Sequence, residues 1–421
     1  MFKFIHAADI HLDSPMHKLD LYEGAPADDF RRATRRAFEN LIQAAITEEV
    51  AFVLIAGDLY DGDWKDYNTG LYLVSQMARL RDAGISVFMV RGNHDAANKI
   101  TKTLRFPDNV SLFSWDKPGT LKLDNVGAAI HGQSFASPSV KKNLANRYPP
   151  AVNGLYNIGL LHTCATGREG HESYAPCSIE DLKNKGYHYW ALGHVHNHEI
   201  IDQNPAIVFS GNTQGRHVRE TGSKGAVLVT VDDSFDTQLE FISLDVVRWV
   251  IAEVDATGAK NEYQVMDQVE KTFQSLLEKN HEIPLAARVH IFGETPAGNK
   301  ILSDPEHWVN EIRSAALDRG NSKIWVEKVR FDTRMPDSAN LLDQKDGAIG
   351  ELLKLFDELS MQTSLQQELV RELADLERKI PRELKDEAEG LKFEDSEWMK
   401  NTLKQVCPML IKRLLKKRTI E

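Results

Sequence analysis

Residues 85–95 read Ile-Ser-Val-Phe-Met-Val-Arg-Gly-Asn-His-Asp, a short apolar run that breaks abruptly into glycine, amide, imidazole and carboxylate. The apolar part, Ile85 to Val90, is typical of a buried strand. Loops at the ends of strands carry a large share of binding and catalytic side chains. An ordinary turn could also follow such a strand, but a turn does not require Asn93, His94 and Asp95 in succession. We therefore interpret Gly92 to Asp95 as part of a functional site.

Four further apolar runs end in the same way, in the segments Asp9-Ile10-His11, Gly57-Asp58, His162 and Gly193-His194-Val195-His196. Taken singly, Asp-x-His and Gly-Asp are common by chance or as helix caps. Five such breaks in one chain are a much stronger signal, and they predict that the polar side chains meet at one place.

The residue types of these segments suit a pair of divalent cations. A carboxylate can bridge two metal ions, while neutral imidazoles and an amide oxygen fill the remaining coordination without adding charge. Two cations about 3.5–4 Å apart can clamp the attacking and leaving oxygens of a phosphoryl group. No cysteine belongs to the set, and so many nitrogen ligands favour Mn²⁺, Fe²⁺ or Zn²⁺ over Mg²⁺.

The spacing of apolar residues predicts an α/β fold for residues 1–245. Strands at 2–7, 52–56 and 85–90 alternate with helices expected at 29–47 and 68–84, which implies parallel strands with a site at their carboxyl ends. Further extended segments and a short capped helix at 178–185 follow. We expect two packed sheets flanked by helices.

Two further regions come after this part. Residues 246–335 alternate strands and helices without any ligand-like pattern, so we expect a small α/β accessory domain. Residues 343–421 are helical and charged, and they end in a basic amphipathic stretch at 410–418. This region either packs on its own chain or docks a partner helix or coiled coil, and the periodicity leaves both possibilities open.

The composition of the 421 residues, 42% hydrophobic and 27% charged, is that of a soluble protein with two or three domains. The long apolar run of a membrane helix and the features of a leader peptide are both missing, and three unpatterned cysteines favour a reducing compartment. We therefore expect a cytoplasmic protein that does not enter a membrane. The net charge of −11 argues against a general coat of basic residues for nucleic acid, although local basic patches remain compatible with it.

Two basic groups stand out in the sequence. Arg31-Arg32 and Arg35-Arg36 lie one turn apart on an expected helix, where a solvated face is the ordinary explanation. Arg216 and Arg219 follow the turn Gly211-Asn212-Thr213, close in sequence to His196. There they either contact a substrate phosphate or serve as surface charge.

In order and composition, the five segments resemble the motif set of the calcineurin-like metallophosphoesterases. The resemblance implies one metal ion held by Asp9, His11 and His196, and a second held by Asn93, His162 and His194. Asp58 would be the bridging carboxylate. His94 would be the catalytic histidine rather than a ligand, with Asp95 orienting its ring. Protonated, His94 could stabilise charge on the phosphoryl group or protonate the leaving oxygen.

Residues 6–13, residues 57–61 and the expected accessory domain are similar to one branch of that family, the SbcD-type DNA-repair exonucleases, close to the YhaO group. Asp13 stands where SbcD usually has glycine, which favours the YhaO-like group. The resemblance implies a Mn²⁺-dependent nuclease, 3′ to 5′ on duplex ends and endonucleolytic on single strands. It also implies an SMC-like ATPase partner of the SbcC or YhaN kind, met by the C-terminal helices, and a homodimer.

Two other functions are compatible with the same residues. One is a phosphatase or cyclic-nucleotide phosphodiesterase that uses the same metal pair, although such enzymes rarely carry an accessory domain and a helical tail. The other is a scaffold subunit of DNA repair that has lost catalysis, against which the intact candidate ligands and His94 argue.

Overall fold

The computed structural model describes residues 1–14, 27–61, 67–97, 105–165, 174–281, 283–319, 323–334 and 348–379, and parts of 395–410. The chain divides into two compact units, residues 1–334 and 335–421. We describe each unit by itself.

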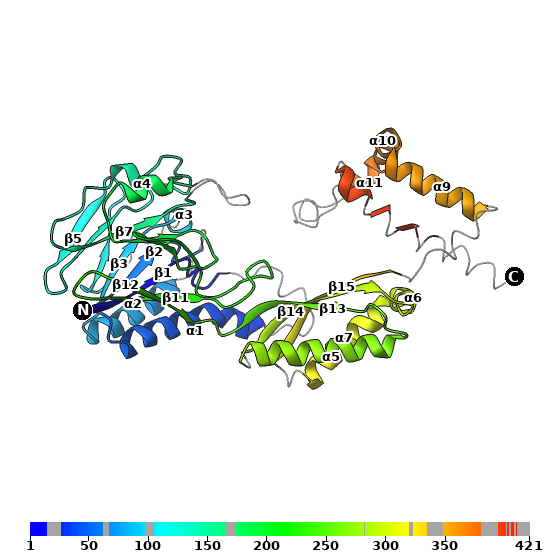
Figure 1. The fold of residues 1–421 in the computed structure, drawn as a ribbon, viewed down its shortest axis with the longest axis horizontal. Coiled ribbons are helices and arrows are strands. Elements are labelled where there is room, and N and C mark those ends of the chain that lie inside the picture. The colour runs from blue at the N-terminus through cyan, green and yellow to red at the C-terminus, as the bar shows by residue number, and fades with distance from the viewer. Residues whose placement is uncertain are drawn as a thin grey trace. The chain divides into compact units, whose positions relative to one another are not determined.

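The first sheet of the larger unit holds the strands that the amino-terminal sequence pattern predicts. Its strand order is β12-β11-β1-β2-β3-β4. The parallel strands are β1 (Phe2–Ala7), β2 (Phe52–Ala56), β3 (Ser86–Val90) and β4 (Val110–Leu112), while β11 (Gly225–Val231) and β12 (Thr237–Ser243) run antiparallel to their neighbours. Helices α1 (Ala27–Thr47) and α2 (Tyr67–Asp82) lie side by side along one face of this sheet (Figure 1).

The second sheet has the order β5-β6-β7-β8-β10-β9. Its strands are β5 (Gly119–Leu123), β6 (Ala128–Gly132), β7 (Tyr156–His162), β8 (Tyr189–Gly193), β10 (Ala206–Phe209) and β9 (Glu199–Gln203). The short helix α4 (Ile179–Lys183) begins with the expected capping box, in which Ser178 accepts from the Asp181 N–H. This helix and its surroundings cover the outer face of the second sheet.

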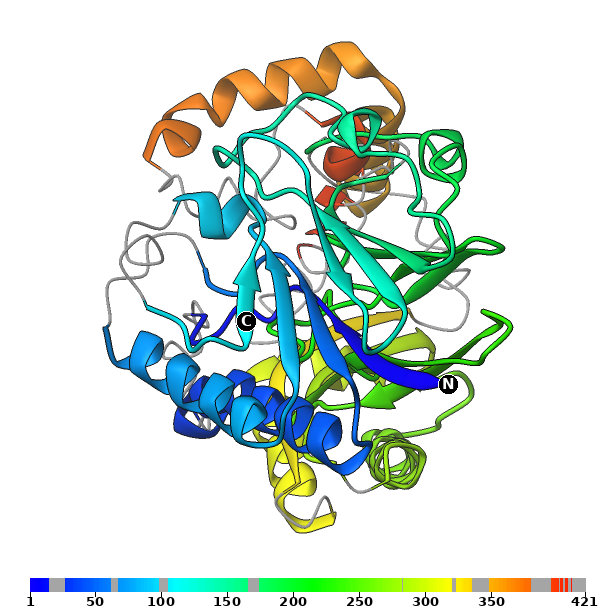
Figure 2. The ribbon, with the colours of Figure 1, turned by 90° about the vertical axis from the view of Figure 1, so that its left-hand side faces the viewer.

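The main core lies between the two sheets, as expected for packed sheets flanked by helices. Phe4 stacks on Phe52 within the first sheet, with ring centroids 5.0 Å apart, and meets Tyr189 of the second sheet edge-on at 5.2 Å. In Figure 2 the blue helices α1 and α2 lie on the opposite side of their sheet from the cyan and green strands of the second sheet. Burial of this apolar surface fixes the two sheets relative to each other.

A third, smaller sheet completes the larger unit. Its parallel strands have the order β13-β14-β15 and the bounds Arg248–Asp255, Leu285–Glu294 and Ile324–Arg334. Helices α5 (Glu262–Lys279), α6 (Gly298–Ser303) and α7 (Pro305–Arg319) pack on one face around a separate core (Figure 1). Ala33 of α1 belongs to one apolar cluster with Val247, Trp249 and Ala286, so this sheet also packs against the rest of the unit.

The smaller unit is helical over its described residues, as the sequence predicts. It contains α9 (Ala348–Met361), α10 (Thr363–Glu372) and α11 (Ala374–Lys379), and Met399 and Leu403 pack against apolar residues of α9 and α10. Most of the basic stretch at 410–418 lies outside the described residues. None of the helices in the described part of the chain is long and apolar enough to span a membrane.

Candidate metal centre

The five candidate segments meet at one edge of the two-sheet core. Asp9 and His11 follow β1, Asp58 follows β2, and Asn93 opens the short helix α3 (Asn93–Ala97) after β3. His162 ends β7, and His194 directly follows β8. The strand edges thus bring together residues that are up to 187 positions apart, from Asp9 to His196.

Three groups of possible ligand atoms form at this edge, and two of them consist only of residues predicted to bind metal. One consists of Asp9, His11 and His196, and the other of Asp58, His162 and His194; within each group the ligand atoms all lie within 4.8 Å of one another. Asn93 belongs beside the second group, because its Oδ1 atom lies 2.9 Å from His162 Nε2. The first group is one of the two sets expected from the sequence, and the second joins two members of the other set to Asp58, the expected bridging carboxylate. The third group joins His11 to Asp61 and His94. The role of each residue toward a metal stays a prediction.

Four of the candidate ligand residues sit in backbone conformations that few side chains adopt. Asp9, His11, Asp58 and His194 have φ angles of 48°, 46°, 51° and 102°. Such left-handed geometry costs free energy for residues other than glycine and is concentrated at functional sites. It turns the side chains away from the direction of a continuing strand and toward the site.

The glycines of the motifs are needed for close packing around the ligands. A Cβ atom on Gly92 would collide with the Asp58 carboxylate and the His162 ring, and one on Gly193 would collide with the Ala56 carbonyl. Gly57 combines a φ of 93° with a similar collision against His162. The glycines next to Asp58, Asn93 and His194 are therefore part of the geometry of the site.

The charges of the site fit bound cations. Burial, together with the neighbouring Asp58 charge, raises the pKa of Asp9 well above its usual value, and burial raises the pKa of Asp58 to about 6. Burial lowers the pKa of His162 to about 3 and that of His11 well below its usual value, so both rings are neutral donors. Buried carboxylates are stable when they are paired or bind metal, and neutral imidazoles are the form that binds metal.

The partner of His94 is Asp61, and the sequence-based assignment of Asp95 to this role is wrong. His94 Nδ1 lies 3.0 Å from Asp61 Oδ1, and this hydrogen bond raises the pKa of His94. Burial alone would raise the pKa of Asp61, but its hydrogen bonds with His11 and His94 and the charge of Arg216 hold it well below its usual value. Asp61 thus links the candidate catalytic histidine to a candidate ligand.

Asp95 instead holds the backbone of the site. Its two carboxylate oxygens accept from the N–H groups of Tyr60 and Gly92, at 3.1 and 3.0 Å. Consecutive residues of a helix point about 100° apart, so the side chain next to His94 in sequence faces away from its ring. Through these two hydrogen bonds, Asp95 joins the loop that follows β2 to the loop that follows β3.

Glu220 is a second residue that the sequence pattern did not reveal. Its Oε1 atom lies 2.6 Å from His196 Nδ1, and its Oε2 atom accepts from Asn212 Nδ2 at 3.0 Å and from the Arg216 N–H at 2.7 Å. Burial would raise the pKa of Glu220, but the His196 hydrogen bond and the Arg216 charge outweigh it and lower the pKa. A carboxylate on the far nitrogen of a ligand histidine fixes its ring and tautomer.

The two predicted arginines differ in position. Arg216 is largely buried and reaches the site, with Nη1 3.4 Å from Asp61 Oδ2 and Nη2 3.5 Å from His196 Nδ1. Arg219 lies on the same turn with an exposed side chain. Arg32 and Arg36 are exposed, as expected for a solvated face, whereas Arg35 is partly buried and forms a salt bridge with Asp13.

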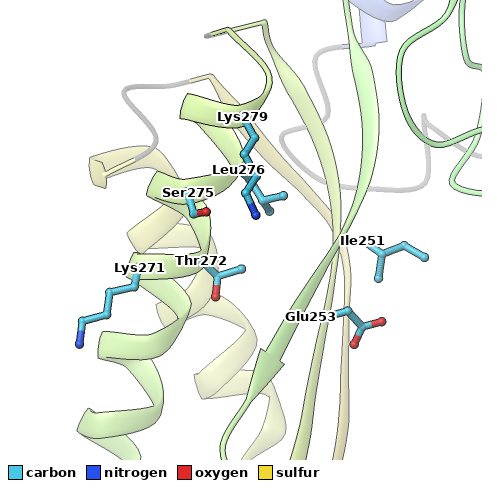
Figure 3. A pocket seen from close by; sticks show the side chains of 7 residues that line it. All are labelled: Ile251, Glu253, Lys271, Thr272, Ser275, Leu276 and Lys279. Atoms are coloured by element: carbon cyan, nitrogen blue, oxygen red, sulfur yellow. The ribbon is translucent and has the colours of Figure 1, made fainter.

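A groove of about 400 Å³ lies elsewhere, in the part of the unit formed by β13–β15. Figure 3 shows the side chains that line it, which are Lys271, Thr272, Ser275, Leu276 and Lys279 of α5 and Ile251 and Glu253 of β13. This groove holds none of the candidate ligands, so we place the chemistry at the strand edge and not here.

Comparisons with known proteins agree with this placement. The family described as calcineurin-like phosphoesterase matches residues 2–198, and the family described as the middle domain of the metallophosphoesterase YhaO matches residues 249–334. An uncharacterized metallophosphoesterase, YhaO of Bacillus subtilis, is 35% identical over 343 residues, which cover 80% of this chain and 83% of that protein.

More distant relatives carry the name DNA double-strand break repair protein Mre11. The one from Sulfurisphaera tokodaii is 26% identical over 302 residues, covering 66% of this chain and 73% of that protein. The one from Aeropyrum pernix is 30% identical over 258 residues, covering 57% and 60%. Together with the YhaO match, these findings show that the chain belongs to the calcineurin-like metallophosphoesterases, a family of metal-dependent hydrolases.

Proposed function

We propose that this protein is a two-metal nuclease that hydrolyses phosphodiester bonds of DNA in repair. The observation that carries the proposal is the pair of ligand groups at one strand edge, with His94 beside both. His94 donates its backbone N–H to Asp58 Oδ1 at 2.9 Å, and its ring centroid lies 5.0 Å from that of His11. The names of the Mre11 relatives support DNA as the substrate.

Each residue has a distinct task in this proposal. Bound metal ions would supply an activated nucleophile and neutralise charge on the phosphoryl oxygens. His94, kept protonated by Asp61, donates to a phosphoryl or leaving oxygen. Arg216 adds positive charge beside His196. There a phosphate oxygen could replace part of the contact between the Arg216 guanidinium and the Asp61 carboxylate. Arg219 stays a candidate for contact with a phosphate further along the strand.

The finer assignments follow the family resemblance. We propose Mn²⁺ in both sites, 3′ to 5′ exonuclease action on duplex ends and endonuclease action on single strands. We also propose an SMC-like ATPase partner that binds the C-terminal helices, where Leu355 and Met361 of α9 are exposed by 48% and 83%. A homodimer is a further part of this proposal.

The test is a cleavage assay with Mn²⁺ on duplex DNA labelled at the 3′ or the 5′ end, beside bis-p-nitrophenyl phosphate as a small diester. We expect cleavage of both substrates, no activity in Asp58→Ala, and strongly reduced turnover with retained metal in His94→Asn. Turnover of the small diester without DNA cleavage would identify a phosphatase or small-molecule phosphodiesterase instead. A protein that binds no Mn, Fe or Zn after reconstitution would be a scaffold subunit.

A further inference from the structure

Trp115 is an exposed aromatic side chain at the ligand edge that the metal chemistry does not use. Its side chain is 56% exposed and lies in the turn between β4 and β5. Single exposed apolar residues are common on protein surfaces. The significance of Trp115 therefore depends on where its turn lies and on which charges surround it.

The turn lies two strands away from His162. The Ser134 N–H donates to the Ser114 carbonyl at 3.0 Å, and Gln133 Nε2 donates to the Trp115 carbonyl at 3.0 Å. Gly132 lies opposite Leu160 at the end of β6, and three residues further on the Phe135 ring meets the His162 ring edge-on, with centroids 5.3 Å apart. Ser134 therefore lies in the segment beside His162. Two strand spacings amount to about 10 Å between the backbone of Ser114 and that of His162.

The turn is also rigidly connected to the strand that carries His162. Tyr148 Oη donates to the Leu160 carbonyl at 2.7 Å and accepts from the Gln133 N–H at 2.9 Å. Tyr148 is 3% exposed. A buried side chain thus joins β7 to the residue that holds the Trp115 carbonyl, which fixes Trp115 relative to the candidate metal ligands.

The side chains around Trp115 are mainly basic. Arg147 Nη2 donates to the Asp116 carbonyl at 3.1 Å, and Lys185 Nζ donates to the Asn146 and Tyr148 carbonyls at 2.9 Å each. Lys117 is exposed beside them. The acids beside these three cations are Asp116 and Asp181, whose pKa the hydrogen bonds of Ser178 and the charge of Lys185 lower. Three positive and two negative groups leave a small net positive charge, on a chain whose total charge is −11.

We propose that Trp115, Lys117 and Arg147 form a binding surface for single-stranded DNA next to the scissile phosphate. Trp115 stacks on an unpaired base, and the two cations contact phosphates on either side of it. An aromatic platform beside basic side chains is the general means of binding single strands without reading their sequence. This inference rests on the proposed nuclease function and adds to it the side of the metal site on which the strand lies.

The test measures binding of a fluorescein-labelled single-stranded oligodeoxynucleotide by anisotropy, in EDTA so that no cleavage occurs. We expect Trp115→Ala to weaken binding by about tenfold, within the range for the loss of one base–aromatic stack. Trp115→Phe should retain most of the affinity. Lys117→Glu and Arg147→Glu should weaken binding and reduce its dependence on salt. Tyr263→Ala is the matched control, because Tyr263 is a 72% exposed aromatic residue on α5.

Hydrolysis of bis-p-nitrophenyl phosphate with Mn²⁺ distinguishes an effect on DNA binding from an effect on the metal site. The rate should stay within about twofold of wild type in all Trp115 variants, because stacking on a neighbouring base plays no part in cleaving a small diester. Unchanged oligonucleotide affinity in Trp115→Ala, with DNA cleavage by the wild type intact, would overturn the inference and leave the nuclease proposal standing. An altered oligomeric state of Trp115→Ala in size-exclusion chromatography, with unchanged DNA affinity, would instead assign the surface to protein contact. Failure of the wild type to cleave any DNA would overturn the nuclease proposal itself.

Discussion

His94 Nδ1 and Asp61 Oδ1 lie 3.0 Å apart, although 33 positions separate the two residues in the sequence. Because this contact raises the pKa of His94, the ring keeps its proton to a higher pH than a free histidine would. Activity that needs the cationic ring is present below the raised pKa and is lost as the pH rises through it. Asp61→Asn removes the carboxylate, so the alkaline loss of activity should move to lower pH and turnover should fall by about tenfold or more.

The matched control for Asp61→Asn is Asp95→Asn. Asp95 accepts from the backbone, and within the described part of the chain no hydrogen bond joins it to the His94 ring, so its substitution should lower stability without moving the alkaline limb of the pH–rate profile. The measurement is turnover of bis-p-nitrophenyl phosphate between pH 6 and pH 10 with saturating Mn²⁺. A shift of the alkaline limb in Asp95→Asn alone would contradict the assignment of Asp61.

Glu220→Gln should loosen metal binding. The variant keeps the size of the side chain but removes the charge that holds the His196 ring, and the loss of such a carboxylate typically costs about 10- to 100-fold in metal affinity. Titration calorimetry with Mn²⁺ measures the change directly. Asp245→Asn serves as the control, because Asp245 is a buried carboxylate that accepts from Arg248 Nε and Nη2 and has no contact with a candidate ligand in the described structure. Equal Mn²⁺ affinities in wild type and Glu220→Gln would argue against the positioning role.

Gly92→Ala should abolish metal binding through packing alone. Its Cβ atom would collide with the Asp58 carboxylate and with the His162 ring, so both residues must move. Gly119→Ala is the comparison, since the nearest atom to its Cβ is a Phe113 ring carbon at 3.4 Å. We expect Mn²⁺ to raise the melting temperature of wild type and Gly119→Ala but not that of Gly92→Ala, measured by differential scanning fluorimetry.

His6 should make the protein sensitive to acid. Burial lowers its pKa to about 3, while in the unfolded chain the pKa is near the ordinary 6.5. The unfolded state therefore binds more protons between these values, and the contribution of His6 to stability is complete above pH 6.5 and declines as the pH falls, by at most roughly 1.4 kcal/mol per pH unit. His6→Gln should flatten this dependence. The free energy of unfolding, measured with urea in EDTA at pH 5 and pH 7.5, checks this prediction. An equal change in that free energy between the two pH values for wild type and His6→Gln would count against it.

The sequence was informative about the fold because the relevant signals are local. Strands 52–56 and 86–90 are short, mostly apolar runs, followed by Gly57 and by Arg91-Gly92, and the helices beside them repeat apolar residues every three or four positions. Asp9, His11, Asp58, Asn93, His162, His194 and His196 could be proposed for the same reason, since each sits where such a run breaks.

Asp61 and Glu220 could not be found in this way. Neither follows a strand directly, and each is defined by a contact with a histidine that is distant in sequence, at 33 positions for His94 and 24 for His196. Asp95 was assigned to His94 from adjacency, which is misleading within a helix. The domain boundaries near 245 and 343 stay predictions, although residues 1–334 form one compact unit.

The left-handed backbone at Asp9 and Asp58 has a consequence for how this protein can change over generations. Apart from glycine, asparagine and aspartate are the residues that tolerate this conformation best. A single base substitution converts an aspartate codon into an asparagine codon, and the new side chain has nearly the same shape without the charge. If Asp9 and Asp58 hold the metal ions as predicted, a lineage can lose hydrolysis in one mutational step while it keeps the folded protein. Folded, inactive descendants are close neighbours of the enzyme in sequence space, and only selection on the reaction itself removes them.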